Sequence, residues 1–221
     1  MKMIAVNASP RTQWNTAQLL QSALSGATSA GAETRLVHLY DLKFRGCISC
    51  FACKKGHGET AARCVLRDDL AELLDDISSS CGALLIGSPI YLGDVTSLAR
   101  AFLERLVFPV VSYSKETRSY AKGVLNSGFI YTMGLPADAA QKRGYDYVYR
   151  TIQRYLQLLG GTSEFITCAD TFQFDDYAKY NTSNIDVAQK ADVRQTQFPV
   201  DLQTAFDMGK RLALADDAMM G

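Results

Sequence analysis

The stretch that decides the fold is MIAVNASPRTQWNTAQLL, residues 3–20. Residues 3–6 are apolar and predict a buried strand, and the apolar side chains after residue 16 fall on one side of a predicted helix over about 14–29. Between the two lies a loop rich in hydroxyl and amide side chains, residues 7–16. A strand that leads through such a loop into a helix points backbone N–H groups and the positive end of the helix dipole at one place. The stretch therefore predicts an anion site, with a phosphate as the expected ligand.

Side chains of the same loop strengthen this prediction. Ser9, Asn15 and Thr16 can donate hydrogen bonds to a phosphate, and Arg11 adds a positive charge. The alternative is an ordinary helix N-cap, with Asn15 or Thr16 as the capping residue.

The commoner nucleotide-binding motifs are absent from the sequence. No G-x-x-x-x-G-K-[ST] occurs, which excludes an ATPase P-loop, and no G-x-G-x-x-G follows the first predicted strand, as a dinucleotide-binding fold requires. The G-x-G-x-x-A at 56–61 follows a segment of cysteines and lysines instead of a strand, so we interpret it as loop glycine.

Length and charge narrow the class of protein. The 221 residues suit a single domain, and 48% apolar residues are enough for one sizeable core. Lys and Arg number 23 and Asp and Glu also 23, so the composition favours neither nucleic acid nor an acidic membrane surface as a partner. The chain starts directly with the first predicted strand, and no apolar run reaches membrane-spanning length. We expect a cytoplasmic protein.

Strand and helix patterns alternate along the whole chain, which predicts a parallel sheet with helices on both faces. Two segments depart from this alternation: a cysteine-rich loop insertion at 41–65 and an irregular segment at 170–198, after which Pro199 is expected to open the last helix. We expect residues 1–221 to form one domain. The predicted strands are residues 3–6, 34–40, 82–87, 124–132 and 164–168.

Two more loops follow predicted strands and meet the first at the carboxyl edge of the sheet, where ligands of open α/β sheets bind. One is residues 88–97, in which Pro89 restricts the backbone, Gly93 permits close approach and Tyr91 supplies a flat ring. The other is residues 132–136. A phosphate loop beside two loops that can grip a planar ring predicts a mononucleotide with an aromatic base, and flavin mononucleotide (FMN) fits. The alternative for each of the two later loops is plain turn chemistry.

The motif N-A-S-P-R-x-x-x-N-T at 7–16, with G-S-P-I-Y-x-G-D at 87–94, resembles the flavodoxin-like NADPH-dependent FMN reductase family. The cysteine-rich loop is similar to that of the family's iron–sulfur flavoprotein branch. The resemblance implies an α/β flavodoxin-like three-layer sandwich with a five-stranded parallel sheet in the order 2-1-3-4-5. One departure is Asn7-Ala8, where relatives often have Gly.

The resemblance also implies a binding site and an activity. The residues that would bind FMN are Ser9, Arg11, Trp14, Asn15 and Thr16 around the phosphate, and Pro89, Ile90, Tyr91, Gly93, Thr132, Met133 and Gly134 around the ring. The expected activity is FMN-dependent transfer of electrons from NAD(P)H to a quinone, nitroaromatic, flavin or protein acceptor. The flavin carries the chemistry, so no residue is assigned as a catalytic acid or base. A homodimer or homotetramer is expected.

Four of the six cysteines cluster in the sequence. Cys47, Cys50 and Cys53 are spaced by two residues, and Cys64 follows after ten more. Tight spacing of this kind suits a [4Fe–4S] cluster held by four thiolates, and four cysteines also suit zinc. The third possibility is a thiol-lined loop that binds no metal. The ten-residue gap is longer than in iron–sulfur flavoproteins, which leaves the role of Cys64 open.

These possibilities give rival functions. With a cluster, the protein would be an iron–sulfur flavoprotein that carries single electrons to or from the flavin. If the protein binds FMN but does not turn over, it would be a redox sensor that uses its cysteines as a thiol switch. If the cysteines bind zinc, it would be a nucleotide-binding protein without redox chemistry. Four cations, each interpreted as a solvated charge or a contact for the 2′-phosphate of NADPH, are Arg100, Arg105, Lys122 and Arg143.

Overall fold

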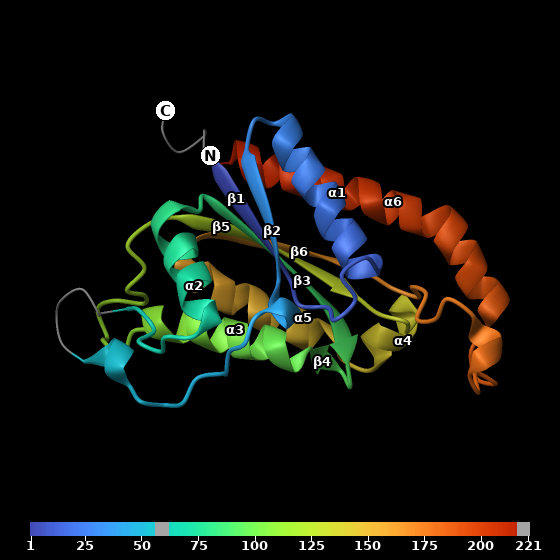
Figure 1. Ribbon diagram of the computed structural model, residues 1–221, viewed down its shortest axis with the longest axis horizontal. Helices are drawn as coiled ribbons and strands as arrows, with labels where there is room; N and C mark the ends of the chain where they lie inside the picture. Colours follow the sequence, from blue (N-terminus) through green and yellow to red (C-terminus); the bar gives the residue numbers. More distant parts are fainter. Residues whose placement is uncertain (56–61, 216–221) are drawn as a thin grey trace.

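The computed structural model describes residues 1–55 and 62–215 (Figure 1). The G-x-G-x-x-A match at 56–61 lies outside the described residues. The strands are β1 (Lys2–Asn7), β2 (Glu33–His38), β3 (Ala83–Tyr91), β4 (Asp94–Val95), β5 (Leu125–Thr132) and β6 (Gly160–Cys168). The α-helices are α1 (Asn15–Ser29), α2 (Asp69–Ser80), α3 (Ser97–Val107), α4 (Ala137–Lys142), α5 (Asp146–Leu156) and α6 (Val187–Leu214). Short 3₁₀ turns lie at Leu39–Asp41, Ala52–Lys54, Phe108–Val110, Gln157–Leu159 and Tyr177–Lys179.

The strands form the predicted sheet. In the described part of the chain, β2, β1, β3, β5 and β6 lie side by side in that order and all pair in parallel, which is the predicted order of five strands. A sixth strand, β4, was not predicted: it pairs antiparallel with the end of β3 through Ile90 with Val95 and Tyr91 with Asp94. The fold is therefore the flavodoxin-like three-layer α/β sandwich.

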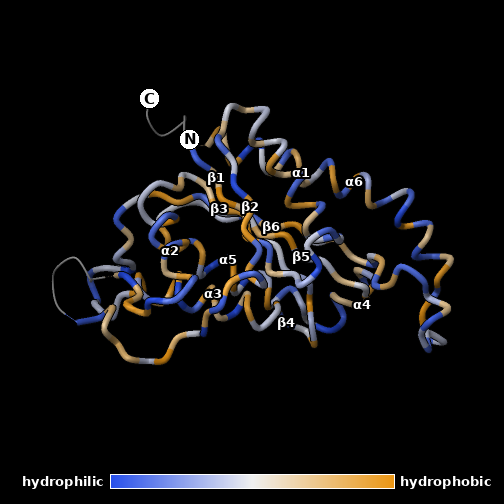
Figure 2. The backbone as a smooth tube through the Cα atoms, in the orientation of Figure 1, coloured by the Kyte–Doolittle hydropathy of each residue, from blue (hydrophilic) through white to orange (hydrophobic). Residues whose placement is uncertain are grey.

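Helices cover both faces of the sheet because side chains alternate along each strand. Met3 and Ala5 of β1 pack under α1 and α6, while Ile4 and Val6 face the side of α2, α3 and α5. Figure 2 shows the hydrophobic residues concentrated along the central strands. All four of these side chains are fully buried, so β1 is a central strand covered on both faces.

The last helix begins earlier than predicted. It starts at Val187, and Pro199 lies inside it. The irregular segment is therefore shorter than the expected 170–198, and the prediction that Pro199 opens the helix is wrong. Asp186 caps the helix by accepting a hydrogen bond from the Gln189 N–H. Proline removes one N–H from the helix, and burial of side chains on both sides of it, such as Phe198 and Ala205, offsets that loss.

Asp201 of α6 is buried beside Cys168 and accepts a hydrogen bond from Gln197 at 2.8 Å. Burial raises the pKa of Asp201, against smaller opposing effects of the hydrogen bonds from Gln197 and Cys168. Because the folded pKa is the higher one, the folded state keeps the proton after the unfolded chain has lost it. Stability therefore falls as pH rises above about 4, the ordinary pKa of an aspartate.

We expect Asp201→Asn to raise the melting temperature at pH 8 by about 2–4 °C, the change that about 1 kcal/mol produces in a chain of this length. The gain should shrink as pH approaches 4.5. Thermal melts across this range test the prediction. Asp207→Asn is the matched control, because exposed Asp207 accepts the same type of bond from Gln203 on the same helix. An equal gain in both variants, or none in Asp201→Asn, would contradict it.

Candidate functional site

The loop after β1 is folded by its own polar side chains. The Asn7 Oδ1 accepts a hydrogen bond from the Ser9 N–H at 3.0 Å, and the Ser9 Oγ accepts one from the Arg11 N–H at 3.2 Å. The other end of the Asn7 amide lies 2.9 Å from the His38 ring at the end of edge strand β2. These bonds hold the loop in a tight turn.

The first turn of α1 has no side-chain cap. Trp14 is the N-cap residue and its side chain makes no capping hydrogen bond. Asn15 and Thr16 lie inside the helix, so the alternative that one of them is an ordinary N-cap is wrong. The first N–H groups of a helix have no partner within it. Together with the helix dipole they make this end of α1 suitable for an anion.

Two buried hydrogen bonds join the three predicted loops. The Thr16 and Thr132 hydroxyls lie 2.8 Å apart and connect the first loop to the end of β5. The Thr96 hydroxyl donates to the Ala8 carbonyl at 2.8 Å and connects the second loop to the first. Within the second loop, the Thr96 N–H donates to the Ser88 Oγ at 3.1 Å. The three loops thus meet at one edge of the sheet, as predicted.

The second loop is more regular than predicted. Pro89, Ile90 and Tyr91 belong to β3, and a turn at Leu92 and Gly93 leads back into β4. Leu92 and Gly93 both have positive φ, 53° and 86°, the geometry of a tight hairpin turn. Tyr91 is half exposed, so its ring remains accessible beside the site.

The third loop offers less than the sequence suggests. The Met133 side chain is buried, with its sulfur 3.5 Å from the Tyr149 hydroxyl, and its N–H donates to the Cys168 carbonyl. At Gly134 a Cβ would overlap the side chain of Gln173. The Met133 side chain thus packs into the core, and a contact of either residue with a flavin ring remains a prediction.

A segment that sequence reasoning did not assign lies across the first loop. The Phe172 carbonyl accepts hydrogen bonds from the Trp14 indole at 3.0 Å and from the Asn15 amide at 2.7 Å, and the Gln173 carbonyl accepts one from Arg11. These carbonyls hold the donor side chains of the loop in place. No local sequence pattern predicts this contact, because the two segments are far apart in the sequence.

Two cations of α6 also reach the site. Lys190 is buried and donates to the Gly134 carbonyl at 2.7 Å and to Asp170 at 2.8 Å. Arg194, one turn later, donates to the Asn15 Oδ1 at 3.2 Å. Sequence reasoning missed both because it placed them outside the helix, although Asp186 followed three residues later by Gln189 resembles a helix-start signal.

The four clustered cysteines surround one small hollow. Cys47, Cys50, Cys53 and Cys64 all line a cavity of about 20 Å³ next to Phe108, and all four are free thiols. Among the described residues, no three His, Cys, Asp or Glu side chains converge closely enough to hold a metal ion. The donor set fits a four-thiolate centre. Ligation would require the thiols to draw together.

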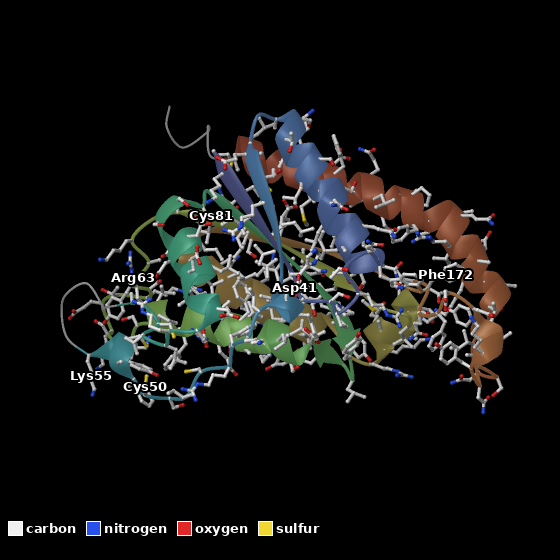
Figure 3. The ribbon with its side chains drawn as sticks, viewed as in Figure 1. Asp41, Cys50, Lys55, Arg63, Cys81 and Phe172 are labelled. Atoms are coloured by element: carbon white, nitrogen blue, oxygen red, sulfur yellow. The ribbon has the colours of Figure 1, made fainter. Side chains whose placement is uncertain are left out.

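Two cations fasten the cysteine-rich loop to the fold. The Lys54 ammonium donates to the carbonyls of Phe108, Pro109 and Val111 at the end of α3, the last at 2.6 Å. Arg105 is fully buried and binds Asp68. Both interpretations of Arg105 from the sequence, a solvated charge and a 2′-phosphate contact, are therefore wrong. Figure 3 shows Cys50 of the cysteine-rich loop toward one end of the molecule and Phe172, which contacts the first loop, toward the other.

A family model described as NADPH-dependent FMN reductase matches residues 1–133, which include the first two loops and all four clustered cysteines. The chain belongs to this family. An iron–sulfur flavoprotein of Methanocaldococcus jannaschii is 32% identical over 105 residues, covering 48% of this chain and 51% of that one. One of Archaeoglobus fulgidus is 32% identical over 105 residues, covering 48% of each. The chain spans about half the length of the curated relatives it matches.

Solved structures share the fold of this FMN reductase family member. An azoreductase from Bacillus anthracis superposes with a TM-score of 0.66 at 13% identity, covering 96% of this chain and 99% of that one. An NAD(P)H:quinone oxidoreductase from Methanothermobacter marburgensis gives a TM-score of 0.67 at 14% identity, covering 96% of both. Across the described residues no helix has the length and apolarity needed to cross a membrane.

Proposed function

We propose that the protein is an FMN-dependent oxidoreductase that takes electrons from NAD(P)H and passes them to a quinone, nitroaromatic, flavin or protein acceptor. The observation that carries the proposal is the joining of the three loops through the Thr16–Thr132 and Thr96–Ala8 hydrogen bonds. These two bonds place the loop that is suited to a phosphate and the accessible aromatic ring of Tyr91 at the same edge of the sheet. Membership of the FMN reductase family supports the same cofactor.

In this proposal the protein binds and orients the cofactor. FMN, when bound, supplies the ring that accepts a hydride and releases electrons. The uncapped first turn of α1, with Ser9, Asn15 and Arg11, would hold the phosphate, and Tyr91 would lie beside the ring. Residues 1–221 would act as one FMN-binding domain within a homodimer or homotetramer. The free thiols suit a reducing compartment such as the cytoplasm.

Turnover tests this proposal. Protein loaded with FMN should oxidise NADH or NADPH when a quinone is added, at a rate that scales with bound FMN. A negligible rate with FMN fully bound would contradict the enzyme and favour an FMN-binding sensor.

Weakened FMN binding is expected for the double variant Ser9→Ala with Thr16→Ala. Each lost hydrogen bond costs about 1 kcal/mol, and more when the acceptor is charged, so affinity should fall about 10- to 100-fold. Quenching of flavin fluorescence measures it. The matched control is Ser25→Ala with Thr28→Ala, two exposed hydroxyls of the same helix. Equal affinities of the two double variants would remove phosphate recognition from the loop.

A second candidate function is electron carriage through an iron–sulfur cluster. It is favoured by the single hollow that all four cysteines line, and the relatives named iron–sulfur flavoproteins agree with it. Iron and sulfide analysis of anaerobically purified protein tests it. About four irons per chain, reduced in Cys50→Ser, supports the cluster; one zinc without iron, or no metal, contradicts it.

A further inference from the structure

The first turns of α6 carry two cations at the candidate site: Lys190 contacts Gly134 and Asp170, whereas Arg194 contacts Asn15 of the phosphate loop. The two cations differ in how their charge is balanced. Lys190 forms an ion pair with Asp170. Arg194 forms no ion pair with any carboxylate among the described residues. Its guanidinium stacks on Phe198 at 4.1 Å and is partly buried, and burial lowers the pKa of Arg194. A partly desolvated arginine without a counter-ion is suited to an anionic ligand.

Arg194 also fixes the orientation of a residue in the loop. It donates to the Asn15 Oδ1 at 3.2 Å and to the Gln18 Oε1 at 3.0 Å. A guanidinium has only donors, so Asn15 must turn its oxygen toward it. The amide nitrogen of Asn15 then faces the other way, where it donates to the Phe172 carbonyl at 2.7 Å. Arg194 thus fixes Asn15 with its donor end, the amide nitrogen, on the side of the Phe172 carbonyl and away from the guanidinium.

We propose that Arg194 is a specificity-determining residue that makes this site select a flavin with a 5′-phosphate over one without. It acts by orienting the Asn15 amide as a donor and by adding an unbalanced positive charge beside the first turn of α1. The inference rests on the proposed function, because it requires a flavin phosphate at this loop. Arg194 contacts Asn15 and Gln18, so its effect on the ligand is one of positioning and charge.

The test compares the dissociation constants of FMN and riboflavin, which share the ring and differ in the phosphate. In Arg194→Met, Asn15 loses its fixed orientation and the site loses a positive charge. FMN binding should then weaken about 10- to 100-fold, the size of effect expected when one hydrogen bond to a charged group is lost, while riboflavin binding changes less than about twofold. Arg194→Lys keeps the charge but cannot bridge Asn15 and Gln18, so an intermediate loss is expected. Added salt should weaken FMN binding more in the wild type than in Arg194→Met.

The matched control is Arg211→Met, the same change on the same helix at an exposed residue paired with Glu164. Its preference for FMN over riboflavin should equal that of the wild type. Inorganic phosphate should compete with FMN in the wild type, and less so in Arg194→Met. Competition equal in the two proteins would overturn the inference.

The outcomes separate the inference from the function beneath it. A wild type that binds no FMN contradicts the proposed function. If the wild type prefers FMN over riboflavin and Arg194→Met shows the same preference, the inference is overturned and the proposed function stands. Equal losses for FMN and riboflavin would reduce Arg194 to a structural role and also overturn it. If Arg194→Met does not fold, Arg194→Lys decides: a fall in preference of about threefold or more supports the inference, and an unchanged preference overturns it.

Discussion

Asp68→Ala is expected to lower the free energy of unfolding by about 3–5 kcal/mol, the usual cost of removing one partner of a buried ion pair. The Arg105 guanidinium is fully buried and lies 2.6 Å and 2.8 Å from the two carboxylate oxygens of Asp68. It also donates to the carbonyls of Arg45 and Leu66, at either end of the cysteine-rich loop. Without Asp68, a charged group would remain buried with neutral partners only.

The same pair predicts a pH dependence. Burial acts to raise the pKa of Asp68, but hydrogen bonds and the charge of Arg105 outweigh it and hold the pKa below its ordinary value. The stabilisation is therefore complete above about pH 4, the ordinary pKa, and is lost as pH falls through the lower folded pKa. Wild-type stability should fall more steeply on acidification than that of Asp68→Ala.

Urea unfolding measures both effects. Asp75→Ala is the control for an exposed pair, because Asp75 lies on α2, whose N-cap is Asp68, and pairs with exposed Arg67 at 3.2 Å. Its loss should cost less than about 1 kcal/mol. Asp68→Ala combined with Arg105→Met should recover part of the stability, since the uncompensated charge is gone. A loss in Asp68→Ala no larger than in Asp75→Ala would contradict this account of the pair.

Gly209→Ala is expected to destabilise the fold by about 3 kcal/mol or more, the upper range for forcing an extra carbon into a packed core. Helices α1 and α6 run side by side on one face of the sheet (Figure 1). They touch at glycines: a Cβ at Gly209 would overlap the Ala23 carbonyl of α1, and one at Gly26 would overlap the Phe206 carbonyl of α6. Main-chain atoms cannot move aside as a flexible side chain can, so the helices would have to separate.

The consequence should extend to the site, because α6 carries Lys190 and Arg194. Thermal melts and flavin titration of Gly209→Ala should show both lower stability and weaker FMN binding. Gly123→Ala is the matched control: no heavy atom lies within 4 Å of a Cβ at Gly123, so stability should be unchanged. If Gly209→Ala has the same melting temperature as the wild type, the close contact of the two helices is contradicted.

Local patterns were sufficient for the sheet and the first loop. The apolar run of β1 and the polar loop after it are contiguous in sequence, and their geometry depends on bonds between near neighbours such as Asn7 with Ser9. The parallel pairing followed from the alternation of strand and helix patterns, and the strand order from the family resemblance. The four clustered cysteines line one hollow, but among the described residues no three of them converge closely enough to hold a metal, so their convergence on a cluster stays a prediction.

What the sequence could not show depends on contacts between distant segments. Pro199 is a usual helix start, whereas α6 begins twelve residues earlier, at Val187, with Asp186 as its local cap. The packing of Phe198 against distant segments helps to keep Pro199 inside the helix. The contact of Phe172 with Trp14 spans 158 positions. The roles of Lys190 and Arg194 follow from these two facts, so they required the structure.

The most direct measurement of the central claim is a crystal structure of the protein with FMN. The account predicts the phosphate within about 3 Å of backbone N–H groups of the loop at 9–16, with the ring beside Tyr91. An empty loop at saturating FMN, or FMN bound at another place on the protein, would contradict it.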